Sequence, residues 1–135
     1  MSKVSTDPIA DMLARIRNAN AVNIMDITLP HSAIKESIAK VLADNNFIVS
    51  VATTKGEIKN SKQLTLALST SQQSPKITSI KRISSPGRRI YISYKDIPRI
   101  KRGRGIVILS TAKGVMEGEQ ARAKQIGGEV ICEVY

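Results

Sequence analysis

The chain has 135 residues, a net charge of +10, 41% hydrophobic residues and only 3% aromatic ones, so we expect an aliphatic core. This length suits one average domain or two small lobes. Cys132 is the only cysteine, which excludes a disulfide framework and favours a reducing compartment. No apolar run approaches the roughly 18 residues of a membrane-spanning helix, and no signal-peptide pattern opens the chain. We therefore expect no membrane association.

The positive charge is concentrated in the second half of the chain. Residues 1–70 hold 8 Lys and Arg against 6 Asp and Glu, whereas residues 71–135 hold 13 against 5. Such a field favours a polyanionic partner, because binding releases counterions from phosphates. The alternative is a basic face that serves only solubility. An anionic membrane surface ranks below both, because no amphipathic helix pairs the basic residues with large apolar ones.

The first half of the chain predicts the order helix, strand, helix, strand, strand. Asp7 and Pro8 predict a helix start, since Asp caps free N–H groups and Pro fits the first helical position. Ser32 is the expected cap of a second helix. Apolar alternation predicts strands at 25–29, 47–51 and 64–68. We therefore expect an α+β lobe over residues 1–70.

A polar stretch predicts a linker at about 71–76, before a mostly β lobe with one short helix at 77–135. Strands are expected at 77–83, 89–94, 106–109 and 129–135. The last of these has apolar residues on both faces, so we expect it in the middle of the sheet. After the strand at 106–109 we expect a small polar loop and then a short helix near 115–124.

The sequence shows no recognisable catalytic motif. No Cys/His cluster has zinc-site spacing, and no P-loop or dinucleotide fingerprint is present. His31 is the only histidine, and Ser110 has no acid or base spaced to activate it. We therefore expect no catalytic residue, no metal and no cofactor. An RNA-modifying or phosphoryl-transfer enzyme is the weakest class of function.

Binding is the stronger class. The loop Ser110–Gly114 offers hydroxyls, backbone N–H groups and one cation, which suit phosphates and base edges but also an ordinary helix cap. Basic side chains gather near two turns, at Arg88, Arg89, Lys101, Arg102 and Arg104. Tyr91 and Tyr94 either stack on a base or pack on the sheet. RNA is favoured over DNA, because no helix-turn-helix, zinc finger or basic zipper is visible.

Three segments closely resemble the bacterial-type small-ribosomal-subunit protein eight family, across essentially the whole chain. They are Thr6–Ala19, Arg82–Tyr91, and Gly105–Met116 with Gly127–Cys132. The resemblance implies a two-lobed α+β protein that is a structural constituent of the small ribosomal subunit. It implies direct binding to the central domain of the small-subunit ribosomal RNA, assistance in its assembly, and recognition mainly by the C-terminal lobe.

The resemblance also implies the RNA-binding residues. They are Ser110, Thr111, Ala112, Lys113, Gly114, Tyr91, Arg88, Pro86 and Glu129, with Thr6, Asp7, Ser32 and Lys35 near a secondary contact. The basic charge near the two turns adds Arg89 and Arg102 as expected RNA-binding residues. Tyr91 is expected to stack, and Glu129 to support the loop or to accept from a base amino group. Three positions depart from the family pattern: Ala112 replaces a serine, Ser85 a basic residue before Pro-Gly, and Ala33 another basic residue.

The expected partners are small-subunit ribosomal RNA and neighbouring small-subunit proteins, with the chain a monomer within a cytoplasmic or organellar ribosome. Some family members also repress their own messenger RNA. A free RNA-binding translational regulator is therefore the alternative function.

Overall fold

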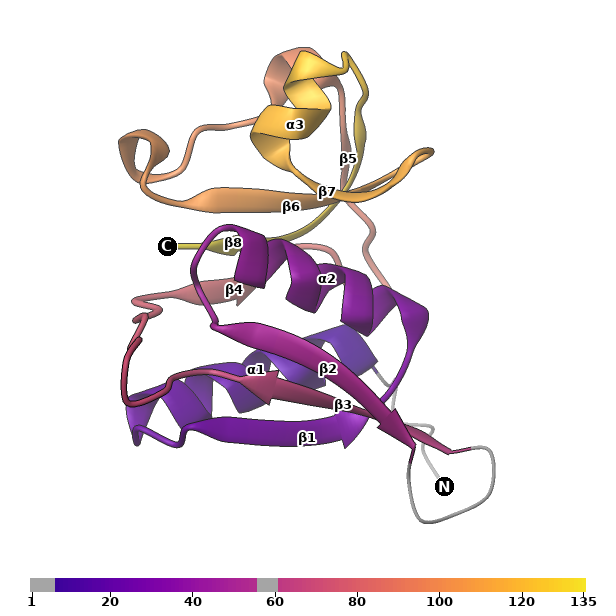
Figure 1. Cartoon of the computed structure of the whole chain (residues 1–135). Helices are drawn as coiled ribbons and strands as arrows, with labels where there is room; N and C mark the ends of the chain where they lie inside the picture. Colours follow the sequence, from indigo (N-terminus) through magenta and orange to yellow (C-terminus); the bar gives the residue numbers. More distant parts are fainter. Residues whose placement is uncertain (1–6, 56–60) are drawn as a thin grey trace. The chain divides into compact units, whose positions relative to one another are not determined.

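The computed structural model describes residues 7–55 and 61–135, which form an α+β fold of two compact units (Figure 1). Ala14–Thr78 form the N-terminal unit. Ser79–Tyr135, together with the described residues up to Leu13, form the C-terminal unit. The α+β fold class is confirmed. The expected lobe bounds 1–70 and 77–135, with a linker at 71–76, stay a prediction.

The N-terminal unit contains a three-stranded antiparallel sheet in the order β1-β3-β2. Its elements follow the predicted order: α1 (Pro8–Ala21, which begins in the other unit), β1 (Asp26–Pro30), α2 (Ala33–Asp44), β2 (Ser50–Lys55) and β3 (Lys62–Ala67). Leu64 and Leu66 alternate along β3 and are fully buried, as are Ile38 and Leu42 of α2. Alternation of period two in the strand and helical spacing in α2 therefore build this aliphatic core.

Glu36 joins three segments of the N-terminal unit through its carboxylate. Thr53 of β2 donates to Oε1 at 2.6 Å, and His31 Nε2 lies 3.1 Å from the same oxygen. Lys40, one turn along α2, places Nζ 3.0 Å from Oε2. The Thr53 hydrogen bond, followed by those of Lys40 and His31, lowers the pKa of Glu36 to about 2. His31 is thus engaged with Glu36 in a polar network.

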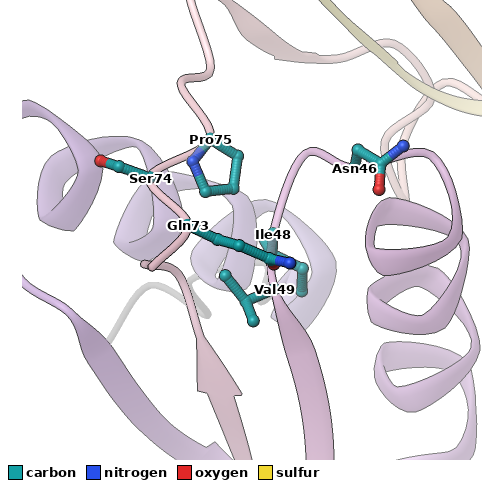
Figure 2. Close-up of a pocket in the computed structure, with 6 residues that line it drawn as sticks. All are labelled: Asn46, Ile48, Val49, Gln73, Ser74 and Pro75. Atoms are coloured by element: carbon teal, nitrogen blue, oxygen red, sulfur yellow. The ribbon is translucent and has the colours of Figure 1, made fainter. Parts of the chain in front are cut away.

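A shallow hollow of about 330 Å³ lies in the N-terminal unit, where the segment after β3 passes the turn that precedes β2 (Figure 2). Asn46, Ile48, Val49, Gln73, Ser74 and Pro75 line it. None of these side chains is an acid, a base or a thiol, so the hollow offers no group for proton transfer.

The C-terminal unit is built on a five-stranded sheet with β8 (Gly128–Val134) at its centre. β8 pairs with β6 (Ile106–Thr111) on one side, and with β4 (Ile80–Arg82) and β5 (Tyr91–Ile92) on the other. β7 (Gly114–Glu117) extends the sheet beyond β6. The prediction of a central final strand is confirmed. Its Cys132 is fully buried, and this burial raises the pKa of the thiol to about 12.

The short helix predicted near 115–124 is present, but it begins only at residue 118, and the predicted passage from the loop directly into it is wrong. Thr111 pairs with Gly114 across a tight turn, and β7 returns along β6 before α3 (Gly118–Ala123) begins. Gly114 has a φ of +111°, which lets the chain reverse at this point. Val115 and Met116 then continue the ladder opposite Ser110 and Leu109, so strand pairing prevails over the helical pattern.

The pair Gly127-Gly128 lets β5, β6 and β8 approach closely. A Cβ atom on Gly128 would lie 2.3 Å from the backbone oxygen of Ser110, and one on Gly127 would lie 2.3 Å from that of Ile92. Both neighbours are main-chain atoms and cannot turn aside as a side chain can. The close approach of the three strands therefore requires glycine at both positions.

Gly128→Ala is expected to lower the free energy of unfolding by about 2–3 kcal/mol, because the added methyl group forces β6 and β8 apart. Gly87→Ala is the matched control, since a Cβ atom there meets nothing within 4 Å. Its effect is expected to stay within about 0.5 kcal/mol. Urea unfolding of both variants measures the difference, and equal effects would contradict the packing argument.

Glu36→Gln is expected to destabilise the protein near neutral pH and progressively less as the pH falls. The folded-state pKa of Glu36, about 2, lies below the ordinary value of 4.5. Its stabilising contribution is therefore present above pH 4.5 and is lost as the pH falls through 2. Urea midpoints of wild type and variant at pH 7 and pH 2.5 measure this convergence. Thr53→Val should reproduce it in part, and a gap that stays constant with pH would exclude the ionic mechanism.

Candidate nucleic-acid interface

Three of the predicted site residues form a row across the C-terminal sheet. Ser110 of β6 lies directly opposite Glu129 of β8, and Glu129 lies opposite Tyr91 of β5. Residues opposite one another in antiparallel strands project to the same face. Tyr91 keeps 66% of its surface exposed. The row thus presents a hydroxyl, a carboxylate and an aromatic ring on one face at the ends of three strands.

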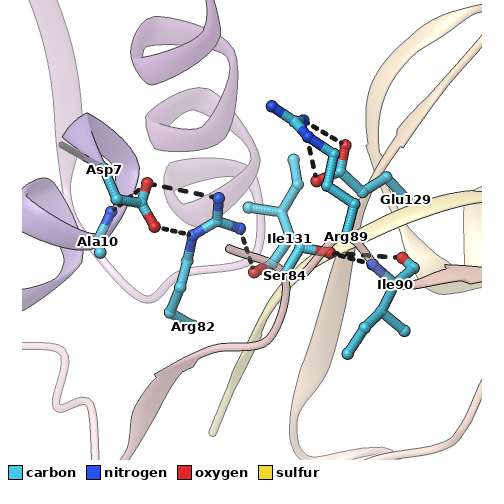
Figure 3. A network of polar contacts seen from close by, with 8 residues as sticks. All are labelled: Asp7, Ala10, Arg82, Ser84, Arg89, Ile90, Glu129 and Ile131. Atoms are coloured by element: carbon cyan, nitrogen blue, oxygen red, sulfur yellow. Dashed lines mark hydrogen bonds and ion pairs between the residues drawn. The ribbon is translucent and has the colours of Figure 1, made fainter. Parts of the chain in front are cut away.

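Glu129 is paired within this row. Arg89 Nη1 lies 3.1 Å from Oε1 and 3.5 Å from Oε2, and the glutamate side chain is only 13% exposed (Figure 3). Arg89 comes from the turn just before β5. The ion pair neutralises an acid that would otherwise repel a phosphate, and it holds the arginine beside the row.

The turn that carries Pro86 and Arg88 is tied to the sheet by a buried serine. Ser85 and Arg88 exchange backbone hydrogen bonds of 3.0 and 3.1 Å, which closes the turn around Pro86-Gly87. Fully buried Ser84 accepts from the backbone N–H of Ile90 at 3.0 Å (Figure 3). Pro86, Arg88 and Arg89 are exposed. The turn therefore projects its basic side chains from an anchored base.

The hairpin loop after β6 is stabilised by Thr111. Its hydroxyl donates to the Gly114 carbonyl at 2.8 Å and accepts from the Lys113 N–H at 3.1 Å. Ser110 is half-buried, and its hydroxyl makes no hydrogen bond within residues 7–55 and 61–135. Ala112 and Lys113 are exposed. Thr111 thus shapes the loop, while the Ser110 hydroxyl and the Lys113 ammonium remain available to a ligand.

Asp7 fulfils a structural role at the start of α1. Its Oδ1 accepts from the N–H of Ala10 at 3.2 Å, and its Oδ2 pairs with Arg82 Nε at 3.0 Å (Figure 3). Arg82 Nη1 also donates to the Ile131 carbonyl at 2.9 Å. Ile131 is the extra residue of a β-bulge, because Ile108 pairs with Cys132 and Leu109 with Val130. One arginine therefore connects the helix cap to the irregular point of β8.

The remaining predicted residues are not part of the row. Arg102 is exposed in a turn before β6, at the opposite end of that strand from Ser110. Ser32 and Lys35 belong to the N-terminal unit, where the Ser32 hydroxyl accepts from the Lys35 N–H at 3.3 Å as the predicted helix cap. Only 8% of Lys35 is exposed. Thr6 lies outside the described residues.

Sequence reasoning missed the supporting residues of the interface. Arg82 and Ser84 lie in the segment Arg82–Tyr91 that carries the family resemblance, but no role was predicted for either. The ion pair of Arg82 with Asp7 joins residues 75 positions apart. A single sequence carries no signal for such a long-range pair. The Gly127-Gly128 pair was visible, but its requirement for space appears only when β5 and β6 are in place.

Within the part of the chain that the structure describes, no group of three or more His, Cys, Asp or Glu residues could hold a metal ion. The described helices also include none that is long and apolar enough to cross a membrane.

Residues 7–135 match the family model described as Ribosomal protein S8. The chain is similar to Small ribosomal subunit protein uS8 of Nitratidesulfovibrio vulgaris strain Miyazaki F, with 47% identity over 96% of this chain and 98% of the relative. The protein of that name from Christiangramia forsetii is 46% identical over 98% and 100%. That from Thiobacillus denitrificans is 48% identical over 96% and 97%. The chain therefore belongs to the ribosomal protein S8 family.

Proposed function

We propose that this protein is a structural constituent of the small ribosomal subunit, that it binds the central domain of the small-subunit ribosomal RNA, and that it assists assembly. Two observations support this function. Relatives named small ribosomal subunit proteins match the chain almost end to end. The row Ser110–Glu129–Tyr91 gathers groups suited to RNA on one face of the sheet. The row is the observation that carries the proposed mechanism.

In this mechanism each group has a distinct task. The Ser110 hydroxyl and the backbone of Ala112 and Gly114 read base edges in an irregular helix, where small side chains allow close approach. The exposed Tyr91 ring stacks on an unstacked base or ribose. Arg88 and Lys113, which form no ion pair among the described residues, bind phosphates without reading sequence.

Glu129 and Arg89 act as a pair in this proposal. The Arg89 guanidinium uses one nitrogen on Glu129 and retains other N–H groups for a phosphate. The Glu129 carboxylate has acceptor capacity left for a base amino group. Glu129 thereby adds a sequence-reading acceptor, and its charge is balanced before RNA arrives.

The secondary contact is proposed to involve Thr6, Asp7, Ser32 and Lys35. Asp7 contributes indirectly, because its carboxylate is engaged with Arg82 and with the start of α1. Ser32 likewise orders the start of α2. Lys35 offers little surface to RNA, since only 8% of it is exposed.

The proposed partners beyond RNA are neighbouring small-subunit proteins, with the chain present as one copy in a cytoplasmic ribosome and without catalytic activity. Cosedimentation with small subunits tests this placement. A chain that binds RNA but stays out of the subunit would be the free regulator instead.

Ser110→Ala is expected to weaken binding to the matching small-subunit RNA fragment by about 1–3 kcal/mol, through loss of one base contact. Ser93→Ala is the matched control, because Ser93 is exposed and lies outside the row. Filter binding at fixed salt measures both variants, with a scrambled RNA for the non-specific component. Absence of any salt-sensitive wild-type complex at submicromolar protein would refute RNA binding itself.

Tyr91→Leu is expected to cost about 1–3 kcal/mol of RNA affinity, whereas Tyr91→Phe should retain most of it, because stacking needs the ring and not the hydroxyl. The exposed ring contributes little to the fold, so both variants should unfold at the wild-type denaturant midpoint. Equal affinities of the two variants would mean that Tyr91 does not stack.

A further inference from the structure

A basic turn, Arg99–Arg104, precedes β6 and lies outside the row; of its residues only Arg102 was expected from the sequence to bind RNA. It holds four cations and no acid in six residues. Arg99 lies 3.7 Å from Glu119, which partly offsets its charge. Arg102 and Arg104 are exposed, and neither forms an ion pair within residues 7–55 and 61–135. Two of the four positive charges are thus uncompensated on one short turn.

The backbone of the basic turn adopts an unusual conformation. Lys101, Arg102 and Gly103 have consecutive φ values of +49°, +57° and +87°. Lysine and arginine enter this left-handed region at a cost, and they stay there only when the surroundings hold them. The Ile100 carbonyl accepts from the N–H groups of Gly103 at 3.0 Å and Gly105 at 3.1 Å. These two bonds close the turn.

Gly105 allows the end of the basic turn to pack directly against the end of β8. A Cβ atom at Gly105 would lie 2.6 Å from the Val134 oxygen and 2.8 Å from the Tyr135 Cβ atom. It would also lie 2.6 Å from the Ile100 side chain, which packs on the core of the unit. The turn is therefore fixed to the sheet at its base while its basic side chains extend into solvent.

Tyr135 makes a second contact that fixes the basic turn. The Lys101 ammonium lies 4.7 Å from the centre of the Tyr135 ring, within the range of a cation–π contact. The tyrosine backbone is itself fixed, because its N–H and oxygen exchange bonds of 3.0 and 2.9 Å with Ser79. Lys101 is thereby drawn toward β8, which leaves Arg102 and Arg104 as the outward cations.

The basic turn is well separated from the row. β6 runs six residues between the turn and the hairpin loop, and a strand rises about 3.3 Å per residue, so the two lie about 17 Å apart. No single base or phosphate can contact both. The two ends of β6 must therefore meet different nucleotides.

We propose that the basic turn is a second RNA contact, in which Arg102 and Arg104 bind backbone phosphates and Tyr135, acting through Lys101, is a positioning residue. This inference rests on the proposed RNA-binding function and extends its footprint. An acidic protein partner fits less well, because protein interfaces place apolar side chains at their centre and the exposed residues of this turn are all polar or glycine. A phosphate backbone needs only the two outward guanidinium groups.

The test measures how RNA affinity depends on salt. The double variant Arg102→Gln/Arg104→Gln should lower the slope of log K against log salt by about 1.4–1.8, which corresponds to two lost phosphate contacts. It should not change the ratio of matching to scrambled RNA affinity. The control Lys81→Gln/Lys124→Gln removes the same charge at two exposed positions outside the turn and should keep nearly the wild-type slope.

The positioning role has a separate readout. Tyr135→Leu keeps every charge but removes the ring face, and it should weaken binding about two- to fivefold at fixed salt. Tyr135→Phe keeps the face and should bind as wild type does. Equal binding of all three proteins would overturn the role of Tyr135.

The failures of the two proposals are distinguishable. If Ser110→Ala weakens binding while the Arg102/Arg104 variant keeps the wild-type slope, only the second contact is refuted. If the control pair lowers the slope as much as the Arg102/Arg104 pair, the effect is one of net charge and the second contact is again refuted. If the wild-type chain binds no RNA, the proposed function itself fails. An Arg102/Arg104 variant that binds RNA normally but fails to enter subunits would point to an acidic protein and overturn the inference.

Discussion

The interface depends on a lack of space between three strands. At Gly127 and Gly128 the neighbouring strands β5 and β6 come so close to the start of β8 that no side chain would fit. This close approach sets Ser110, Glu129 and Tyr91 in one row, although 38 positions separate Tyr91 from Glu129 and 19 separate Ser110 from Glu129. The apolar core below the row fixes the sheet, while the two glycines fix the spacing of its functional edge. Packing and recognition are thus coupled at the same pair of residues.

Charge balance is the second constraint. Two acids of this unit, Glu129 in the row and Asp7 at the start of α1, are each matched by an arginine, Arg89 and Arg82. Neither pair needs to contribute much to stability, since partly exposed ion pairs give on the order of 1 kcal/mol or less. Their effect is rather to neutralise two negative charges that would otherwise oppose the cations of the turns. Arg82 has a further task, because its bond to the Ile131 carbonyl satisfies a β-bulge next to the row.

Much of this organisation could be predicted from sequence because it depends on local patterns. The helix caps at Asp7 and Ser32, the alternation in β3 and the apolar faces of β8 are all readable from neighbours in the chain. The short helix expected near 115–124 is present as α3, but it begins only at Gly118, because the ladder between β6 and β7 decides residues 114–117 and that ladder is a tertiary property. The arginine partners of Asp7 and Glu129 could not be predicted for the same reason. Both partners come from distant segments, and charge patterns alone do not say which cation each acid meets.

The buried thiol of Cys132 has a consequence of its own. It lies in the central strand, fully covered, and burial raises its pKa to about 12, so almost no reactive thiolate exists near neutral pH. As the sole sulfhydryl of the chain, it is protected from oxidants for as long as β8 is seated between its neighbours. The low reactivity of this thiol therefore reports that the sheet carrying the interface is intact. A thiol that becomes reactive would show that the sheet has opened.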